Sequence, residues 1–204
     1  MSTFKFYFIH NFKVMGTTIH KQLPSSYNKL FYGMRTLNDV EEKNHNFKIK
    51  NIYNLDMNVK KAIDHIHYDR LIAMGFIKIP INEVKFIMIV REPIERFISV
   101  CNYRFMMHGI TMENHISGLK KKKGSDFLQY KLLNNKNNIK VHLFKMEDKI
   151  GITEFFKEFG ININLDIKKN VSKKTYTIND ISPEDMVFLK EHFKKDSDLY
   201  NSIL

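Results

Sequence analysis

Two runs of continuous apolar and aromatic residues are the most regular features of the hydrophobic pattern along this chain. Phe4–Ile9 is apolar or aromatic at every position except Lys5, and Phe86–Val90 is apolar throughout. Short uninterrupted runs of this kind are typical of strands that are covered on both faces of a sheet. Ile139–Phe144 alternates in the manner of a strand, which predicts a third one.

Apolar residues at helical spacing follow these predicted strands. From Ile19 the chain can run as a helix towards Pro24, and Pro93 suits the first turn of a second helix. The second helix is expected to bury one stripe of residues, namely Ile94, Phe97, Ile98, Cys101 and Phe105. Strands that alternate with helices predict a single α/β domain with a mainly parallel central sheet flanked by helices.

Two further helices are predicted in the C-terminal part of the chain. Thr153 is the expected N-cap of the first, with three phenylalanines directed inward: Phe155, Phe156 and Phe159. Ser182-Pro183, followed by two acidic residues, marks the start of the second. Its buried stripe is expected to consist of Met186, Leu189 and Phe193. With 204 residues and 43% hydrophobic content, the chain can form one domain, residues 1–204, with a substantial core.

The loop between the first predicted strand and helix has the composition of a phosphate-binding loop. Lys13 supplies a mobile positive charge, Gly16 permits close approach of the backbone, and Thr17 and Thr18 supply hydroxyl donors. A strand, a glycine-bearing loop and a helix together present backbone N–H groups to an anion. Taken alone, the stretch is also compatible with a lysine-bearing surface turn that binds nothing.

A second candidate anion site follows the second predicted strand. Arg91 ends that strand, and Ser99 lies two turns into the following helix, on a face that also carries Arg96 and Tyr103. Arg91 and Ser99 are therefore placed to bind one anion between them. The alternative is that Arg91 pairs with Glu95 and that Ser99 is an ordinary helix serine.

Together the two stretches resemble the sulfotransferases that use 3'-phosphoadenosine 5'-phosphosulfate, in particular the carbohydrate sulfotransferases of the heparan and chondroitin type. The first loop of that family usually reads hIPKTGGTS, where h is apolar, and this chain has FIHNFKVMGTTI. The second signature, R-[DE]-P-hhR-hhS, is matched by VREPIERFIS over Val90–Ser99. Phe12 replaces the family's proline, and Val14-Met15 replaces its Thr-Gly.

The resemblance implies a three-layer, P-loop-like fold and transfer of a sulfuryl group from that donor to an acceptor hydroxyl, with a carbohydrate as the implied acceptor and no metal required. It implies that the first loop binds the 5'-phosphosulfate through Lys13, Val14, Met15, Gly16, Thr17 and Thr18. Arg91 and Ser99 would bind the 3'-phosphate, and Lys13 would also be catalytic. Ser172 and Lys173 lie in a segment similar to one near the nucleotide in the family, with a basic surface loop as the alternative explanation.

The stretch Lys61–Leu71 contains the candidate general base. His65 and His67 point to the same side if the segment is extended, and a histidine suits proton removal from an acceptor hydroxyl near neutral pH. The resembled family has a histidine after its second strand, for which His65 is the closest counterpart and His67 the competitor. Alternatives are structural histidines, an H-x-H metal site that lacks further well-spaced ligands, and a glutamate base at Glu41 or Glu42.

Charge and composition add expectations about partners and location. The net charge of +11 favours anionic partners, which could be the nucleotide, an acidic glycan or a nucleic acid, although lysine-rich composition alone also explains it. No nucleic-acid-binding signature is present, so no nucleic-acid partner is expected. Lys120–Lys123, the densest basic run, is predicted to be a solvated loop. Without an apolar run of eighteen residues or a visible signal peptide, the chain is expected to be soluble and cytoplasmic, with its oligomeric state open.

Two rival functions remain at this point. A P-loop kinase requires a lysine after the last glycine of its loop and an acidic residue on a neighbouring strand. In this chain Lys13 precedes Gly16, and the second strand ends in Arg91. The other rival is a non-catalytic basic protein that binds polyanions, which the net charge alone would explain.

Overall fold

The computed structural model describes residues 6–9, 11, 13–23, 85–121, 128–133, 140–167 and 175–204. Several residues singled out from the sequence fall outside these ranges: Glu41, Glu42, His65, His67, Ser172 and Lys173. Within the described part of the chain, no helix is long and apolar enough to cross a membrane.

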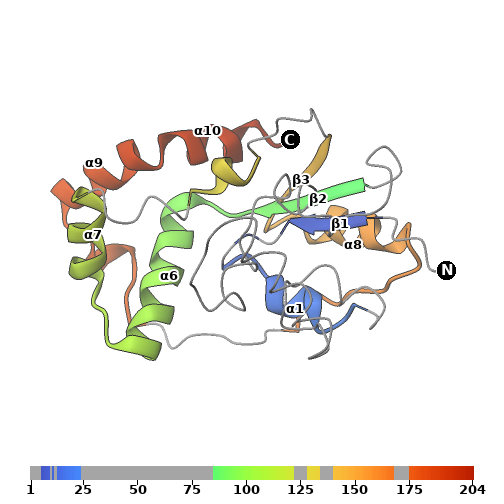
Figure 1. The fold of residues 1–204 in the computed structure, drawn as a ribbon, viewed down its shortest axis with the longest axis horizontal. Coiled ribbons are helices and arrows are strands. Elements are labelled where there is room, and N and C mark those ends of the chain that lie inside the picture. The colour runs from blue at the N-terminus through green and yellow to red at the C-terminus, as the bar shows by residue number, and fades with distance from the viewer. Residues whose placement is uncertain are drawn as a thin grey trace, which may run out of the picture.

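Three parallel strands form the sheet of the described residues, in the order β1-β2-β3 (Figure 1). These strands are β1 (Phe6–Ile9), β2 (Lys85–Val90) and β3 (Val141–Lys145). Ile9 pairs with Met88, and Val90 pairs with Lys145, so all three strands end near one edge of the sheet. The prediction of an α/β fold with a parallel sheet flanked by helices is confirmed.

The α-helices are α1 (Gly16–His20), α6 (Pro93–His108), α7 (Met112–Lys120), α8 (Lys149–Lys157), α9 (Pro183–His192) and α10 (Lys194–Ser202). The described residues also include the short 3₁₀ helices η5 (Gln129–Leu133) and η6 (Ile178–Asp180). The strands point towards α6, which lies beyond their carboxyl ends (Figure 1). Two of the four predicted starts are correct, since Pro93 and Pro183 each occupy the first turn of a helix whose N-cap side chain accepts a backbone N–H.

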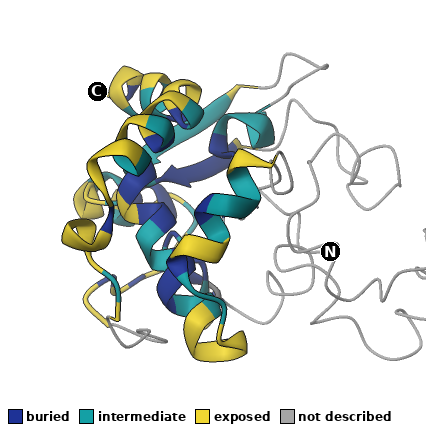
Figure 2. Ribbon diagram, turned by 90° about the vertical axis from the view of Figure 1, so that its left-hand side faces the viewer, coloured by how far each residue is buried: buried dark blue, intermediate teal, exposed yellow. Residues whose placement is uncertain are grey.

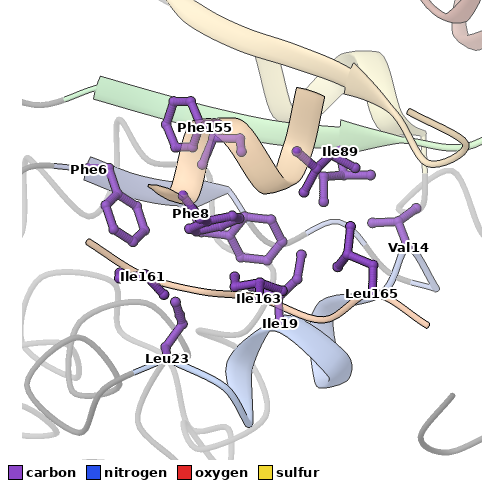
Figure 3. Close-up of a cluster of buried hydrophobic side chains, with 13 residues drawn as sticks. Phe6, Phe8, Val14, Ile19, Leu23, Ile89, Phe155, Ile161, Ile163 and Leu165 are labelled. Atoms are coloured by element: carbon purple, nitrogen blue, oxygen red, sulfur yellow. The ribbon is translucent and has the colours of Figure 1, made fainter. Parts of the chain in front are cut away.

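One face of the sheet packs against α1, α8 and the extended segment 161–165 (Figure 3). Phe6, Phe8, Ile87 and Ile89 supply the strand side of this cluster, in keeping with the two-residue period of a strand. Ile19 of α1 completes the cluster on the side away from the strands. Two of the three phenylalanines predicted to face inward, Phe155 and Phe156 of α8, lie there as well. The completely buried aromatic and branched side chains therefore fix α1 against β1, directly after the loop that carries Lys13.

The opposite face of the sheet packs against the C-terminal helix. Phe86, Met88 and Val90 contact η5 and α10, including Leu199, and Tyr200 packs there as well. A third cluster joins α6, α7 and α9, which lie together at one end of the sheet (Figure 1). Figure 2 shows buried residues along the strands and exposed residues on the outer sides of the helices. The sheet is therefore covered by apolar contacts on both faces.

Three details of the predicted helices are wrong. The first helix begins at Gly16 and ends at His20, because the Ile19 N–H already donates to the Met15 carbonyl. Asp148, and not Thr153, is the N-cap of α8, and the Thr153 hydroxyl donates to the Lys149 carbonyl inside the helix. The predicted core stripe of α6 is too long at its end. Cys101 is buried as expected, but Phe105, the last residue of the stripe, is 36% exposed. The helix extends beyond the cluster that covers its first three turns.

His192, at the end of α9, lies between two aromatic rings. Its ring stacks on Phe188 with centroids 5.7 Å apart and meets Phe193 edge-on at 4.9 Å. Its Nε2 atom is buried and has no hydrogen-bond partner in the described part of the chain. Burial lowers the pKa of His192, an effect that Asp196 opposes and Lys131 adds to. The fold therefore favours the neutral imidazole.

We expect the free energy of unfolding to fall as the pH drops below the ordinary histidine pKa of 6.5, because the unfolded chain then binds a proton that folded His192 does not. The loss is complete below the lowered folded-state pKa. His115 and His142 contribute in the same direction, since burial lowers the pKa of each. Urea unfolding between about pH 7 and pH 5 should show a shallower slope for His192→Phe. The exposed His108→Gln variant should keep the wild-type slope, and an unchanged slope in His192→Phe would contradict the prediction.

Candidate anion-binding site

The loop after β1 has an unusual backbone at two non-glycine residues. Lys13 has φ 64° and Met15 has φ 57°, both in the left-handed region. Each such residue costs on the order of 1 kcal/mol, and it persists only where its surroundings impose it. Val14, between them, is completely buried in the cluster below β1 (Figure 3). The core thus fixes this loop at Val14, next to the half-buried Lys13.

Contacts of α1 with the segment 164–167 hold the other end of the loop. The Gln22 side chain donates to the Asn164 carbonyl at 2.9 Å and accepts the Asn164 N–H at 2.7 Å. Thr18 is buried, and its hydroxyl donates to the Ile167 carbonyl at 3.4 Å. Of the two threonines predicted to bind an anion, Thr18 is therefore engaged within the protein, and Thr17 is half-buried.

Lys13 lies across from α6. Its Nζ atom is 4.6 Å from the centroid of the Tyr103 ring, within the range of a cation–π contact. The pKa of Lys13 is lowered, first by burial and second by the positive charge of Arg91. Two predicted site residues that are 78 positions apart in the sequence thus lie close enough to repel one another. An anion between them would relieve that repulsion.

Arg91 follows the last residue of β2 and is mostly buried, with its side chain 21% exposed. Its Nη2 atom is 3.5 Å from the Glu95 carboxylate, so the pairing considered as an alternative is present as a long, exposed contact. Such a contact contributes at most about 0.5 kcal/mol. The Nε atom of Arg91 is buried without a hydrogen-bond partner in the described part of the chain. The guanidinium therefore retains capacity to bind an acceptor.

A fully buried glutamine, Gln129 of η5, fixes the backbone of Arg91. Its side-chain oxygen accepts the Arg91 N–H at 3.0 Å, and its amide donates to the Arg91 carbonyl at 2.8 Å. The same oxygen accepts from the side chain of Asn11, just after β1, at 2.6 Å. Asn11 also donates to the Ile89 carbonyl at 3.2 Å. One side chain therefore ties together the residues that follow β1 and β2.

Gln129 is in turn held by Asp196 of α10. The Asp196 carboxylate accepts the backbone N–H groups of Gln129 and Tyr130, both at 2.9 Å. It also pairs with Arg96 of α6 at 3.3 Å, and these two side chains are 0% and 2% exposed. Arg96, expected to share a face with Ser99, is thus an interior residue that joins α6 to α10. These buried side chains hold the backbone of the candidate site in place and are not part of its surface.

Three residues of α6 form a row between the two cations. Glu95, Ser99 and Tyr103 are each four positions apart, so they lie one above the other on the helix surface. Arg91 contacts the first of them and Lys13 contacts the last. The row is about 12 Å long, from the rise of 1.5 Å per residue. Ser99 therefore lies between the two cations, half-buried, in the position predicted for an anion contact.

Other predicted contributors differ in what they can offer. The side chain of Val14 is in the core and Gly16 is buried, so these two residues can present only backbone groups. Met15 is partly buried against the same core. Within the described ranges, no three His, Cys, Asp or Glu side chains are placed to hold a metal ion. The described surface is therefore suited to anions, with lysine, arginine, hydroxyl and backbone donors.

Comparisons of this chain with protein-family models, with curated proteins and with solved structures found no match. Any functional conclusion must therefore come from the site itself and from the sequence motifs. Two cations, a serine and a strained loop meet at one edge of the parallel sheet. Ligands of open α/β sheets commonly bind at this carboxyl edge.

Proposed function

We propose that this protein is a sulfotransferase that uses 3'-phosphoadenosine 5'-phosphosulfate, built on a three-layer P-loop-like domain. The observation that carries the proposal is the placement of Lys13 and Arg91. They follow adjacent parallel strands, and their charges lie close enough for Arg91 to lower the pKa of Lys13. These two residues are also the central ones of the two sequence motifs that resemble this family.

The electrostatics of the site favour a ligand with separated negative charges. Two partly buried cations that repel one another raise the free energy of the unliganded protein. A nucleotide with a phosphosulfate at one end and a 3'-phosphate near the other would place an anion beside each cation. A single small anion could contact only one of them closely, so the bisphosphorylated nucleotide should bind more tightly than inorganic sulfate.

Each residue has a defined role in the proposed reaction. Lys13 binds the sulfuryl group and the bridging oxygen, where negative charge grows as the sulfur–oxygen bond to the leaving phosphate breaks. Arg91 and Ser99 bind the 3'-phosphate. The acceptor oxygen attacks sulfur in line while a histidine, His65 or His67, takes its proton. The products are a sulfate ester of a sugar hydroxyl and adenosine 3',5'-bisphosphate.

A thermal-shift comparison tests the proposal. Adenosine 3',5'-bisphosphate should raise the melting temperature more than ATP with magnesium does, because a ligand that binds only the folded state stabilises it. At about a hundred times the dissociation constant the stabilisation is about 2.7 kcal/mol, which is several degrees for a domain of this size. Arg91→Ala should abolish most of the shift. Lys21→Ala, which removes an exposed lysine just after α1, is the matched control and should preserve the shift.

The other outcomes identify the rival functions. A larger shift with ATP and magnesium would overturn the proposal in favour of a kinase. Salt-sensitive binding to a polyanion that survives Lys13→Ala, with no nucleotide bound, would indicate a non-catalytic binding protein. Either result would mean that the anion site does not bind 3'-phosphoadenosine 5'-phosphosulfate as proposed.

A further inference from the structure

The contact between Lys13 and Tyr103 is not explained by the two motifs, because neither includes Tyr103. The ammonium group lies 4.6 Å from the ring centroid and comes from a residue with a left-handed backbone. Lys13 is on a loop fixed through Val14 and α1, and Tyr103 is on α6, so the contact joins two separately anchored elements. Such a contact defines where the end of a flexible lysine side chain lies.

The backbone on the Tyr103 side is firmly held. Asn102, the preceding residue, is buried, and its side-chain oxygen accepts the N–H groups of Thr175 and Tyr176 at 2.7 and 2.8 Å. Its amide donates to the Tyr176 carbonyl at 2.9 Å. Cys101 is also completely buried, in the cluster between α6, α7 and α9. Tyr103 therefore projects from a stretch of helix that is anchored on its buried side.

We infer that Tyr103 is a positioning residue for Lys13. The face of the Tyr103 ring holds the Lys13 ammonium beside the part of α6 that carries Ser99 and contacts Arg91. The ring also stabilises the charged form of Lys13. The inference rests on the proposed function for its role in transfer, but the contact itself acts in the free protein. Lysine side chains carry large rotamer entropy, so fixing the ammonium before the donor binds increases the fraction of productive complexes.

The Tyr103 ring is expected to have a measurable effect on the pKa of Lys13, because opposing electrostatic effects act on that lysine. Among the described residues, Arg91 at the end of β2 and the Tyr103 ring on α6 act on Lys13, and Glu95 of α6 pairs with Arg91. Burial and Arg91 disfavour the ammonium, whereas the negative face of the aromatic ring favours it. Leucine has no such face, so Tyr103→Leu should lower the pKa of Lys13 by removing the ring that favours the ammonium.

The first experiment needs no cofactor or substrate. Wild type and variants are labelled with limiting acetic anhydride across a pH series, and mass spectrometry of the Lys13 peptide gives the midpoint of its reactivity. We expect the midpoint to fall by about one pH unit in Tyr103→Leu and to stay at the wild-type value in Tyr103→Phe, which retains the ring. Tyr130→Leu is the matched control, because it removes a ring from another lysine, Lys195, at 5.4 Å. It should leave the Lys13 midpoint unchanged.

The second experiment measures sulfuryl transfer from the donor to desulfated heparan and chondroitin. Tyr103→Leu should lower kcat about tenfold with KM for the donor changed less than about twofold, and Tyr103→Phe should restore kcat. An unchanged Lys13 midpoint in Tyr103→Leu, or an equal fall in Tyr103→Phe, would overturn the inference. If Tyr103→Leu does not fold, Tyr103→Trp replaces it, and its midpoint should lie at or above the wild-type value. A midpoint for Tyr103→Trp below the wild-type value would equally overturn it.

The two experiments separate the inference from the proposed function. Absence of transfer and of bisphosphate binding in the wild-type protein would remove the sulfotransferase proposal, while the labelling midpoints would still report whether the ring stabilises the Lys13 ammonium. Conversely, normal transfer in Tyr103→Leu with an unshifted midpoint would remove the role of Tyr103 and leave the proposed function standing.

Discussion

Replacing Asp196 by alanine is expected to lower the free energy of unfolding by about 3–5 kcal/mol, the largest effect of any single substitution considered for this protein. The variant would leave the buried Arg96 guanidinium without its carboxylate. It would also leave the N–H groups of Gln129 and Tyr130 without their acceptor. Breaking a buried pair from one side costs the desolvation of the charge that remains, and each orphaned N–H adds to that cost.

Urea unfolding followed by circular dichroism measures this loss. Asp198→Ala, on the same helix but at an exposed position, is the matched control and should change stability by less than about 0.5 kcal/mol. The double variant Arg96→Leu/Asp196→Leu should recover part of the loss, since it removes both charges together. A destabilisation by Asp196→Ala as small as that of Asp198→Ala would show that the network contributes little to the fold.

The same network has a functional consequence. Because Asp196 positions Gln129, and Gln129 binds both backbone groups of Arg91, a folded Gln129→Leu variant should displace Arg91 without touching the ligand. Its thermal shift with adenosine 3',5'-bisphosphate should therefore be smaller than that of wild type at equal ligand concentration.

The strands and two of the four helix starts could be predicted because their causes are local. Phe86–Val90 is apolar at every position, and the observed β2 differs from the predicted strand only by the addition of Lys85. Ser182-Pro183 supplies both a cap and a favourable first turn, and α9 begins there. Thr153 was a misleading signal, because Asp148, five residues earlier, caps the same helix with a carboxylate. Threonine inside a helix can satisfy its hydroxyl with a carbonyl four residues back, as Thr153 does.

The buried polar network could not be predicted from local patterns. Asn11 and Gln129 are 118 positions apart, and no periodic pattern in the sequence indicates that they interact. Asp196 lies near the C-terminus in a polar stretch that does not indicate its partners. Only the tertiary structure shows that these residues contact one another and hold the backbone of Arg91 and the segment after β1. Long-range polar contacts of this kind depend on topology, which a single sequence does not reveal.

The two cations of the site were predictable for a different reason. Lys13 and Arg91 each follow an apolar run, and the ends of neighbouring parallel strands lie at one edge of a sheet. Their proximity is a structural finding, whereas their role as nucleotide ligands stays a prediction, together with the roles of His65 and His67. Tyr103 was placed on the face of α6 that carries Ser99, but nothing in the sequence indicates its contact with Lys13.

Lys13→Ala is expected to lower kcat for sulfuryl transfer by about a hundredfold to a thousandfold, with a much smaller change in the affinity for adenosine 3',5'-bisphosphate. In the proposed reaction the lysine binds the bridging oxygen, where negative charge increases most between the ground state and the transition state. An interaction made mainly in the transition state lowers kcat when it is removed, whereas loss of a uniform binding contact raises KM. The affinity for the product, which lacks the sulfuryl group, should therefore depend mainly on Arg91.

Arg91→Ala should show the opposite pattern, with weaker bisphosphate binding and a raised KM for the donor, because the 3'-phosphate does not react. Radiolabelled transfer to desulfated heparan and chondroitin, combined with calorimetric titration of the bisphosphate, separates the two patterns. Lys13→Arg retains the charge but not the compact ammonium group, and the wider guanidinium should restore binding better than turnover. Equal loss of bisphosphate affinity in Lys13→Ala and Arg91→Ala, with kcat unchanged in both, would mean that the loop only binds the nucleotide. Lys13 would then have no part in stabilising the leaving phosphate.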